Sequence, residues 1–154
     1  MHFLVDTHTH ICDPLFDPDR SAVLQRAAGV GVQKIITVSE TLDDARRNLE
    51  LSHQYPMLLP AAGLYPTHLD WNAAKEMKEF IRNNRDRLVA IGEVGLDFQV
   101  VENRKERDMQ RRIFEEFVDL SCELDLPLNV HSRSAGHQTL AILLEKGARR
   151  VQLH

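Results

Sequence analysis

LVAIGEVGLD, residues 88–97, is a short apolar stretch with an acidic side chain inside it. Continuous apolar runs of this length are typical of parallel strands that are covered on both faces. Burying the carboxylate of Glu93 without a partner would be costly, and the flanking Gly92 and Gly95 indicate close approach of a neighbouring backbone. Glu93 is therefore either a functional carboxylate near the end of a strand or an outward-facing, salt-bridged glutamate.

Segments of similar character lie on both sides of this stretch. Further strands are predicted at 3–8, 34–39, 58–65, 127–133 and 150–154. Amphipathic helical stretches separate the strands at 19–31, 43–55, 72–84, 107–125 and 139–147. Asp43 is the expected N-cap of the second helix. Such alternation forms either an open doubly wound sheet or a (β/α)8 barrel, and no glycine-rich phosphate loop follows the first strand to favour a dinucleotide-binding sheet.

The barrel interpretation predicts an α/β fold, a partial (β/α)8 TIM barrel with six parallel strands and five helices. A complete barrel has eight βα units in about 250 residues, whereas this chain has 154 residues. We therefore expect residues 1–154 to form one domain, the N-terminal three-quarters of a barrel, truncated after a sixth strand that ends at His154. The outer edges of the first and sixth strands would then be unpaired, which favours association with other chains.

The composition bounds the class of protein. A hydrophobic fraction of 43% and a charged fraction of 27% suit a soluble globular chain. The net charge of −4 gives no general attraction for nucleic acid or membranes, so a polyanionic substrate would need a local positive site such as bound metal ions. Two cysteines, no expected secretory signal and no long apolar run predict the cytoplasm, with the nucleus as the alternative.

Histidines follow several of the predicted strands. His8 and His10 are separated by one residue at the end of the first strand, so both rings can point to the same side and reach one metal ion. His131 and His154 end the fifth and sixth strands. Each histidine alone could be a solvated or structural residue, but together with Glu93 they occupy the strand ends where barrel enzymes have their active sites. Imidazole and carboxylate ligands without cysteine favour zinc, manganese or magnesium.

Four further residues are weaker candidates. His68 follows the third strand and Arg133 lies two residues after His131, so either could contact a substrate phosphate. The alternatives are a plain loop histidine and a surface salt bridge. Asp6 and Asp97 could orient metal ligands from outside the metal site, and Asp97 could instead cap the end of its strand.

These motifs together resemble the TatD family of metal-dependent deoxyribonucleases. The resemblance rests on DTHTH, GLYPTH, AIGEVGLDF, LPLNVHSRSAG and VQLH, which occur in this order and span essentially the whole chain. It implies a (β/α)8 barrel of the metal-dependent hydrolase type with two divalent metal ions, zinc, manganese or magnesium. By the same resemblance, His8 and His10 would hold the first ion, His131 and His154 the second, and the catalytic residue Glu93 would bridge them.

The implied function is hydrolysis of DNA phosphodiester bonds by a binuclear-metal mechanism, with DNA as substrate and no membrane partner. In the family, a water-activating aspartate ends the eighth strand, so we expect little or no nuclease activity from the 154-residue chain. Two alternatives stay open: an amidohydrolase-like enzyme that cleaves C–N or ester bonds, and a non-catalytic truncated isoform.

Overall fold

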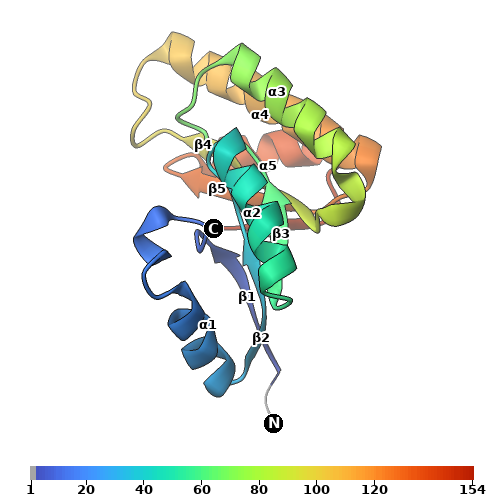
Figure 1. The fold of residues 1–154 in the computed structure, drawn as a ribbon. Helices are drawn as coiled ribbons and strands as arrows, with labels where there is room; N and C mark the ends of the chain where they lie inside the picture. The colour runs from blue at the N-terminus through green and yellow to red at the C-terminus, as the bar shows by residue number, and fades with distance from the viewer. Residues whose placement is uncertain (1–2) are drawn as a thin grey trace.

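The computed structural model describes residues 3–154, and in them six parallel strands and five α-helices alternate (Figure 1). The strands are β1 (Leu4–Thr9), β2 (Val32–Thr37), β3 (Leu58–Ala62), β4 (Ala90–Asp97), β5 (Leu128–Arg133) and β6 (Val151–Leu153). The α-helices are α1 (Arg20–Gly29), α2 (Leu42–Gln54), α3 (Trp71–Asn83), α4 (Arg104–Leu124) and α5 (Gly136–Glu145). Two 3-10 turns lie at Pro14–Phe16 and Arg85–Arg87.

The strands lie side by side in the order β1-β2-β3-β4-β5-β6, and every neighbouring pair is parallel. The sheet curls so strongly that its two edges approach each other, and the ring centroids of His8, on β1, and His154, just after β6, are 4.0 Å apart. This arrangement confirms the predicted partial (β/α)8 barrel.

The helices cover one face of the curled sheet. Ile35 of β2 packs in a cluster with residues of α1 and α2. The next residue, Ile36, packs on the opposite face with strand residues such as Ala61 and Ala90. Since successive strand residues point to opposite faces, the outer face carries the helices and the inner face is the barrel interior.

The largest apolar core lies between β3–β5 and the helices α2, α3, α4 and α5. Helix α4 forms because apolar residues recur on one side of it, and Phe114, Phe117 and Val118 are buried there. The helix ends at Leu124, and the residue that follows it, Asp125, takes a left-handed conformation with φ of 50°. Burial of these apolar side chains packs α4 against β4.

The segments were predicted correctly, with ends that differ by at most three residues. Residues 38–39 and 63–65, for example, were assigned to strands but lie beyond the ends of β2 and β3. The predicted cap of α2 was wrong. Thr41, not Asp43, is the N-cap, because its hydroxyl accepts a hydrogen bond from the Asp44 amide while the Asp44 carboxylate accepts one from the Thr41 amide.

Strands β4 and β1 differ sharply in burial. All eight residues of β4 are buried. In β1 the first four residues are exposed, with 47% of Leu4 and 42% of Val5 accessible to solvent. Within residues 3–154, β1 pairs only with β2 and β6 only with β5. No helix in this described part has the length and apolar character needed to cross a membrane.

Candidate metal centre

Glu93 lies near the middle of β4 with only 1% of its surface exposed. Two neighbouring glycines let β5 approach it closely. A Cβ at Gly92 would lie 2.6 Å from the Cβ of Asn129, and one at Gly95, where φ is 146°, would lie 2.0 Å from the carbonyl oxygen of His131. Any larger residue would push β5 away, so the predicted close backbone approach around Glu93 is present.

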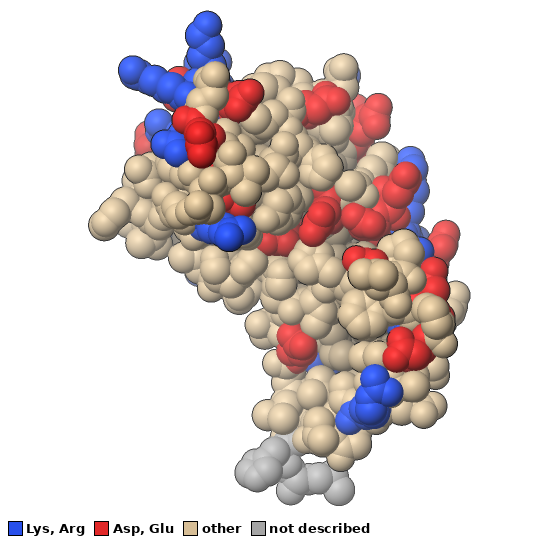
Figure 2. All heavy atoms as spheres, turned by 90° about the vertical axis from the view of Figure 1, so that its left-hand side faces the viewer, with Lys and Arg blue, Asp and Glu red and all other residues tan. Residues whose placement is uncertain are grey.

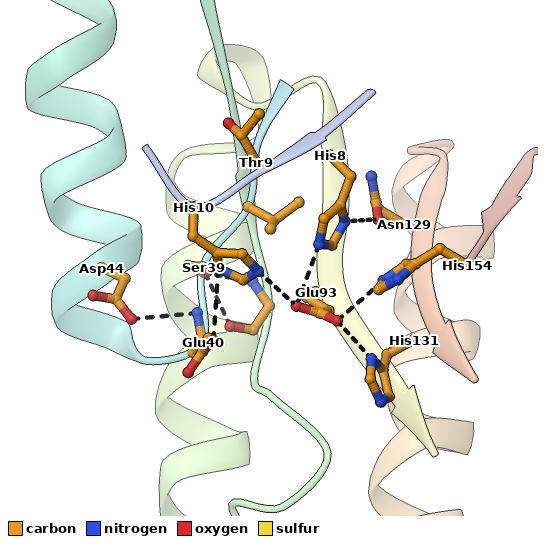
Figure 3. Close-up of polar contacts among 12 residues, drawn as sticks. His8, Thr9, His10, Ser39, Glu40, Asp44, Glu93, Asn129, His131 and His154 are labelled. Atoms are coloured by element: carbon orange, nitrogen blue, oxygen red, sulfur yellow. Dashed lines mark hydrogen bonds and ion pairs between the residues drawn. The ribbon is translucent and has the colours of Figure 1, made fainter. Parts of the chain in front are cut away.

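Four imidazoles surround the Glu93 carboxylate (Figure 3). Its Oε2 lies 3.6 Å from Nε2 of His8 and 3.2 Å from Nε2 of His10. Its Oε1 lies 2.9 Å from Nδ1 of His131 and 3.0 Å from Nε2 of His154. Each carboxylate oxygen therefore faces two histidines. His8 and His131 lie in the carboxyl half of β1 and β5, and His10 and His154 directly follow β1 and β6. Glu93 lies near the middle of β4, not near its end as predicted.

Glu93 and the four histidines form one cluster, which divides into two overlapping groups. Each group has three side chains whose ligand atoms lie within 4.8 Å of one another. One group is His8, His10 and Glu93, and the other is Glu93, His131 and His154. Glu93 is the member that both groups share, and a carboxylate, with two oxygens, can serve two cations at once.

The polar atoms of this cluster are suited to a cation. Oε2 of Glu93 and Nδ1 of His131 are fully buried and, although other members of the cluster lie 2.9–3.6 Å from them, neither atom makes a well-aligned hydrogen bond within residues 3–154. Buried polar atoms without partners are rare and costly. Carboxylate oxygens and imidazole nitrogens at one point are typical ligands of zinc and related divalent ions, so the donor set fits such an ion.

Electrostatics keep the carboxylate charged. Burial raises the pKa of Glu93, but the close approach of His10 and His131, together with the charge of His8, outweighs burial and lowers the pKa to about 2. The nearby carboxylate of Glu93 raises the pKa of His10 against the effect of burial. Burial lowers the pKa of His154, and the neighbouring His8 lowers it further.

His131 has contacts on both sides of its ring. Burial lowers the pKa of His131, but the carboxylates of Glu93 and Asp97 together raise it. Its Nε2 lies 3.3 Å from Oδ2 of Asp97, while Oδ1 of Asp97 accepts hydrogen bonds from the amides of Gln99 and Val100. Asp97 therefore both faces a candidate ligand and caps the end of β4, the two roles considered for it.

Two residues that contact the Nδ1 atoms of His8 and His10 were not predicted from the sequence. Nδ1 of His8 lies 2.8 Å from Oδ1 of Asn129, and Nδ1 of His10 lies 3.6 Å from Oε1 of Glu40. Asn129 precedes His131 by two residues, so strand alternation could have placed both side chains on the inner face. Glu40 follows β2 at the end of the barrel where the other candidates lie. Its position after a strand could therefore also have indicated a contact with these residues.

The remaining sequence candidates lie outside the cluster. Asp6 accepts a hydrogen bond from the backbone amide of His8 at 3.1 Å, with no contact to its ring. His68 lies exposed in the loop after β3, and Arg133 is exposed at the end of β5. Neither His68 nor Arg133 has a hydrogen bond or ion pair between its side chain and the cluster within the described part of the chain, and Arg133 has no carboxylate partner there.

Comparison with known proteins identifies the family. Residues 5–154 match the family described as TatD related DNase. The chain belongs to this family. Human deoxyribonuclease TATDN3 is 37% identical over 98% of the chain and 60% of its own length. The 3′-5′ ssDNA/RNA exonuclease TatD of Salmonella typhimurium is 29% identical over 92% of the chain and 54% of its own length.

A solved structure supports the fold. YjjV of Escherichia coli, named an uncharacterized metal-dependent hydrolase, is 34% identical over 92% of the chain and 55% of its own length. The crystal structure of this TatD homologue matches with a TM-score of 0.83 and 31% identity, over 93% of the chain and 56% of YjjV. The chain thus spans between 54% and 60% of the length of these three relatives.

Proposed function

We propose that the protein is a metal-dependent hydrolase that cleaves phosphodiester bonds of DNA. The observation that carries this proposal is the buried carboxylate of Glu93 with two imidazoles at each of its oxygens. His8 and His10 would hold one divalent ion, His131 and His154 a second, and Glu93 both. Two ions bound side by side supply an activated water and stabilise the charge of a phosphodiester under attack.

The chain's own residues have defined tasks in this proposal. The ionised Glu93 would offset the positive charges of both ions, because its low pKa leaves it charged at neutral pH. Arg133, exposed at the end of β5 and free of a carboxylate partner within residues 3–154, would pair with a substrate phosphate. His68, in the loop after β3, would contact a neighbouring phosphate.

The family of the chain and the charges on its surface indicate the class of substrate. The names of the human and Salmonella relatives refer to deoxyribonuclease and ssDNA/RNA exonuclease activity, so we propose single-stranded DNA cleaved from its 3′ end, with RNA as the second substrate. Figure 2 shows basic and acidic residues interspersed on one face, with no continuous basic surface there. Attraction of the polyanion would therefore come from the metal centre itself. The unpaired Cys12 and Cys122 support a reducing compartment, the cytoplasm or nucleus.

The test is digestion of 5′-labelled single-stranded DNA with Mn²⁺, Zn²⁺ or Mg²⁺. It compares the 154-residue chain with a form extended after His154 by the corresponding part of YjjV, because the resemblance assigns the water-activating aspartate to an eighth strand. We expect the extended form to be faster by about 10²–10⁴-fold, and Glu93→Gln to abolish cleavage in both. Absence of metal-dependent cleavage in the extended form, or its persistence in Glu93→Gln, would contradict the proposal.

A further inference from the structure

Asn129 of β5 uses both ends of its side-chain amide to contact β1. Only 2% of its surface is exposed. Its Nδ2 donates a hydrogen bond to the backbone carbonyl of Thr7 at 2.7 Å, and its Oδ1 lies 2.8 Å from Nδ1 of His8. Figure 3 shows Asn129 beside His8, at the ring nitrogen that does not face Glu93.

These contacts cross the barrel interior. Strands β1 and β5 are not neighbours in the sheet, since β1 pairs with β2 and β5 pairs with β4 and β6. Within the part of the chain that the structure describes, the two bonds of Asn129 are the hydrogen bonds that link β1 to β5. Gly92 makes room for this side chain, because a Cβ at Gly92 would lie 2.6 Å from the Cβ of Asn129.

The chemistry of the amide determines which nitrogen of His8 carries the proton. A carbonyl oxygen only accepts, so the end of the amide facing Thr7 must be the NH₂ group. The oxygen of the amide then faces His8 and also only accepts, so Nδ1 of His8 must be the nitrogen that carries hydrogen. In the neutral form of the ring, Nε2 of His8 therefore keeps its lone pair, and this atom faces Glu93 at 3.6 Å.

We propose that Asn129 is a positioning residue that holds His8 in the Nδ1–H tautomer, with the lone pair of Nε2 aimed at the metal centre. The inference rests on the proposed function for the ion that Nε2 would bind. Hydrogen bonds from outside the ligand set commonly orient metal-binding histidines in this way. An aspartate could not replace Asn129 fully, because it would accept from His8 but present an oxygen to the carbonyl of Thr7.

The first test is made on the unsubstituted, ion-free protein. Two-bond ¹H–¹⁵N correlation spectra at about pH 8.5, above the ordinary imidazole pKa, report which nitrogen of each histidine carries the proton. We expect His8 to be in the Nδ1–H form. An Nε2–H form, or an even mixture of the two, would overturn the inference.

The second test measures how substitutions of Asn129 change the binding of Zn²⁺. Asn129→Leu should release the tautomer preference of His8 and weaken Zn²⁺ binding, measured calorimetrically, by about 10–100-fold. Asn129→Asp should keep the Nδ1–H form, since an acceptor remains. The control is Asn48→Leu, which removes another fully buried asparagine whose bonds join α2 to Thr37 and Val38. It should leave the spectrum of His8 and the Zn²⁺ affinity unchanged.

The outcomes separate this inference from the proposed function. An Nδ1–H tautomer of His8 that Asn129→Leu removes, in a protein that binds no Zn²⁺, would contradict the metal centre and leave the positioning role of Asn129 intact. Zn²⁺ binding that Asn129→Leu does not weaken, or a His8 tautomer that it does not change, would overturn the role of Asn129 alone.

Discussion

Strands β4 and β1 supply side chains to the same cluster, yet β4 is the most protected strand of the sheet and β1 is one of its two exposed edge strands. All eight residues of β4 are buried, including Glu93, whereas the first four residues of β1 are exposed and its outer edge is unpaired within residues 3–154. Packing therefore holds Glu93 in place. His8 and His10 depend more on polar contacts across the barrel and, in the proposed function, on the ions themselves.

The largest expected effect is at Gly95 of β4. Gly95→Ala combines a positive φ of 146° with a Cβ placed 2.0 Å from the carbonyl oxygen of His131. Backbone strain and overpacking together should lower the free energy of unfolding by about 4 kcal/mol, measured by urea denaturation.

Gly29→Ala is the matched control, since a Cβ at this last residue of α1 meets nothing within 4 Å. It should be neutral or stabilising by up to about 1 kcal/mol. Equal losses for the two variants would show that β4 is not tightly packed against β5.

The next largest expected effect is the slowing of hydrogen–deuterium exchange in β1 when ions bind. In the ion-free protein, backbone amides of β1 should exchange with deuterium faster than those of β4, because an edge strand opens locally. Zn²⁺ at about 100 times its Kd should slow exchange in β1 by up to about 100-fold, equivalent to about 2.7 kcal/mol.

Amides at the fraying ends of α3, a helix outside the cluster, serve as the internal control and should not change. Exchange in β1 that is already as slow as in β4, or that Zn²⁺ leaves unchanged, would remove the proposed difference between the two strands.

The smallest effect is a direct comparison of one substitution in both strands. Val94→Ala, at a residue of β4 that is 1% exposed, should cost about 2 kcal/mol of unfolding free energy. Val5→Ala, at a residue of β1 that is 42% exposed, should cost no more than about 0.5 kcal/mol. Thermal or urea unfolding of both variants measures the difference, and a reversed order would contradict the comparison.

Much of the fold followed from sequence because its signals are local. The apolar run around Glu93 and the amphipathic stretches between strands gave the element order and the parallel arrangement. The cap of α2 differs from the prediction because Thr41 and Asp44 have the three-residue spacing of a capping box, which places Asp43 inside the first turn of the helix.

Only part of the candidate metal centre could be predicted from the sequence. His8, His10, His131 and His154 lie within the last three residues of a strand or directly after it, and parallel strands bring such residues together. The contact of Asn129 with His8 spans 121 positions and depends on how far the sheet curls, which no local pattern encodes. The roles of these residues as ligands stay predictions until ions are counted.

The most direct test of the account is the number of divalent ions bound per chain, with and without the carboxylate that both groups share. Equilibrium dialysis against Zn²⁺ followed by elemental analysis should give two ions per chain for the unsubstituted protein. Glu93→Gln should weaken both sites by roughly 100-fold or more, beyond the 10–100-fold of an outer contact, while His68→Ala, outside the cluster, should keep both. Two ions held as tightly by Glu93→Gln as by the unsubstituted protein, or no ion bound by either, would contradict the account.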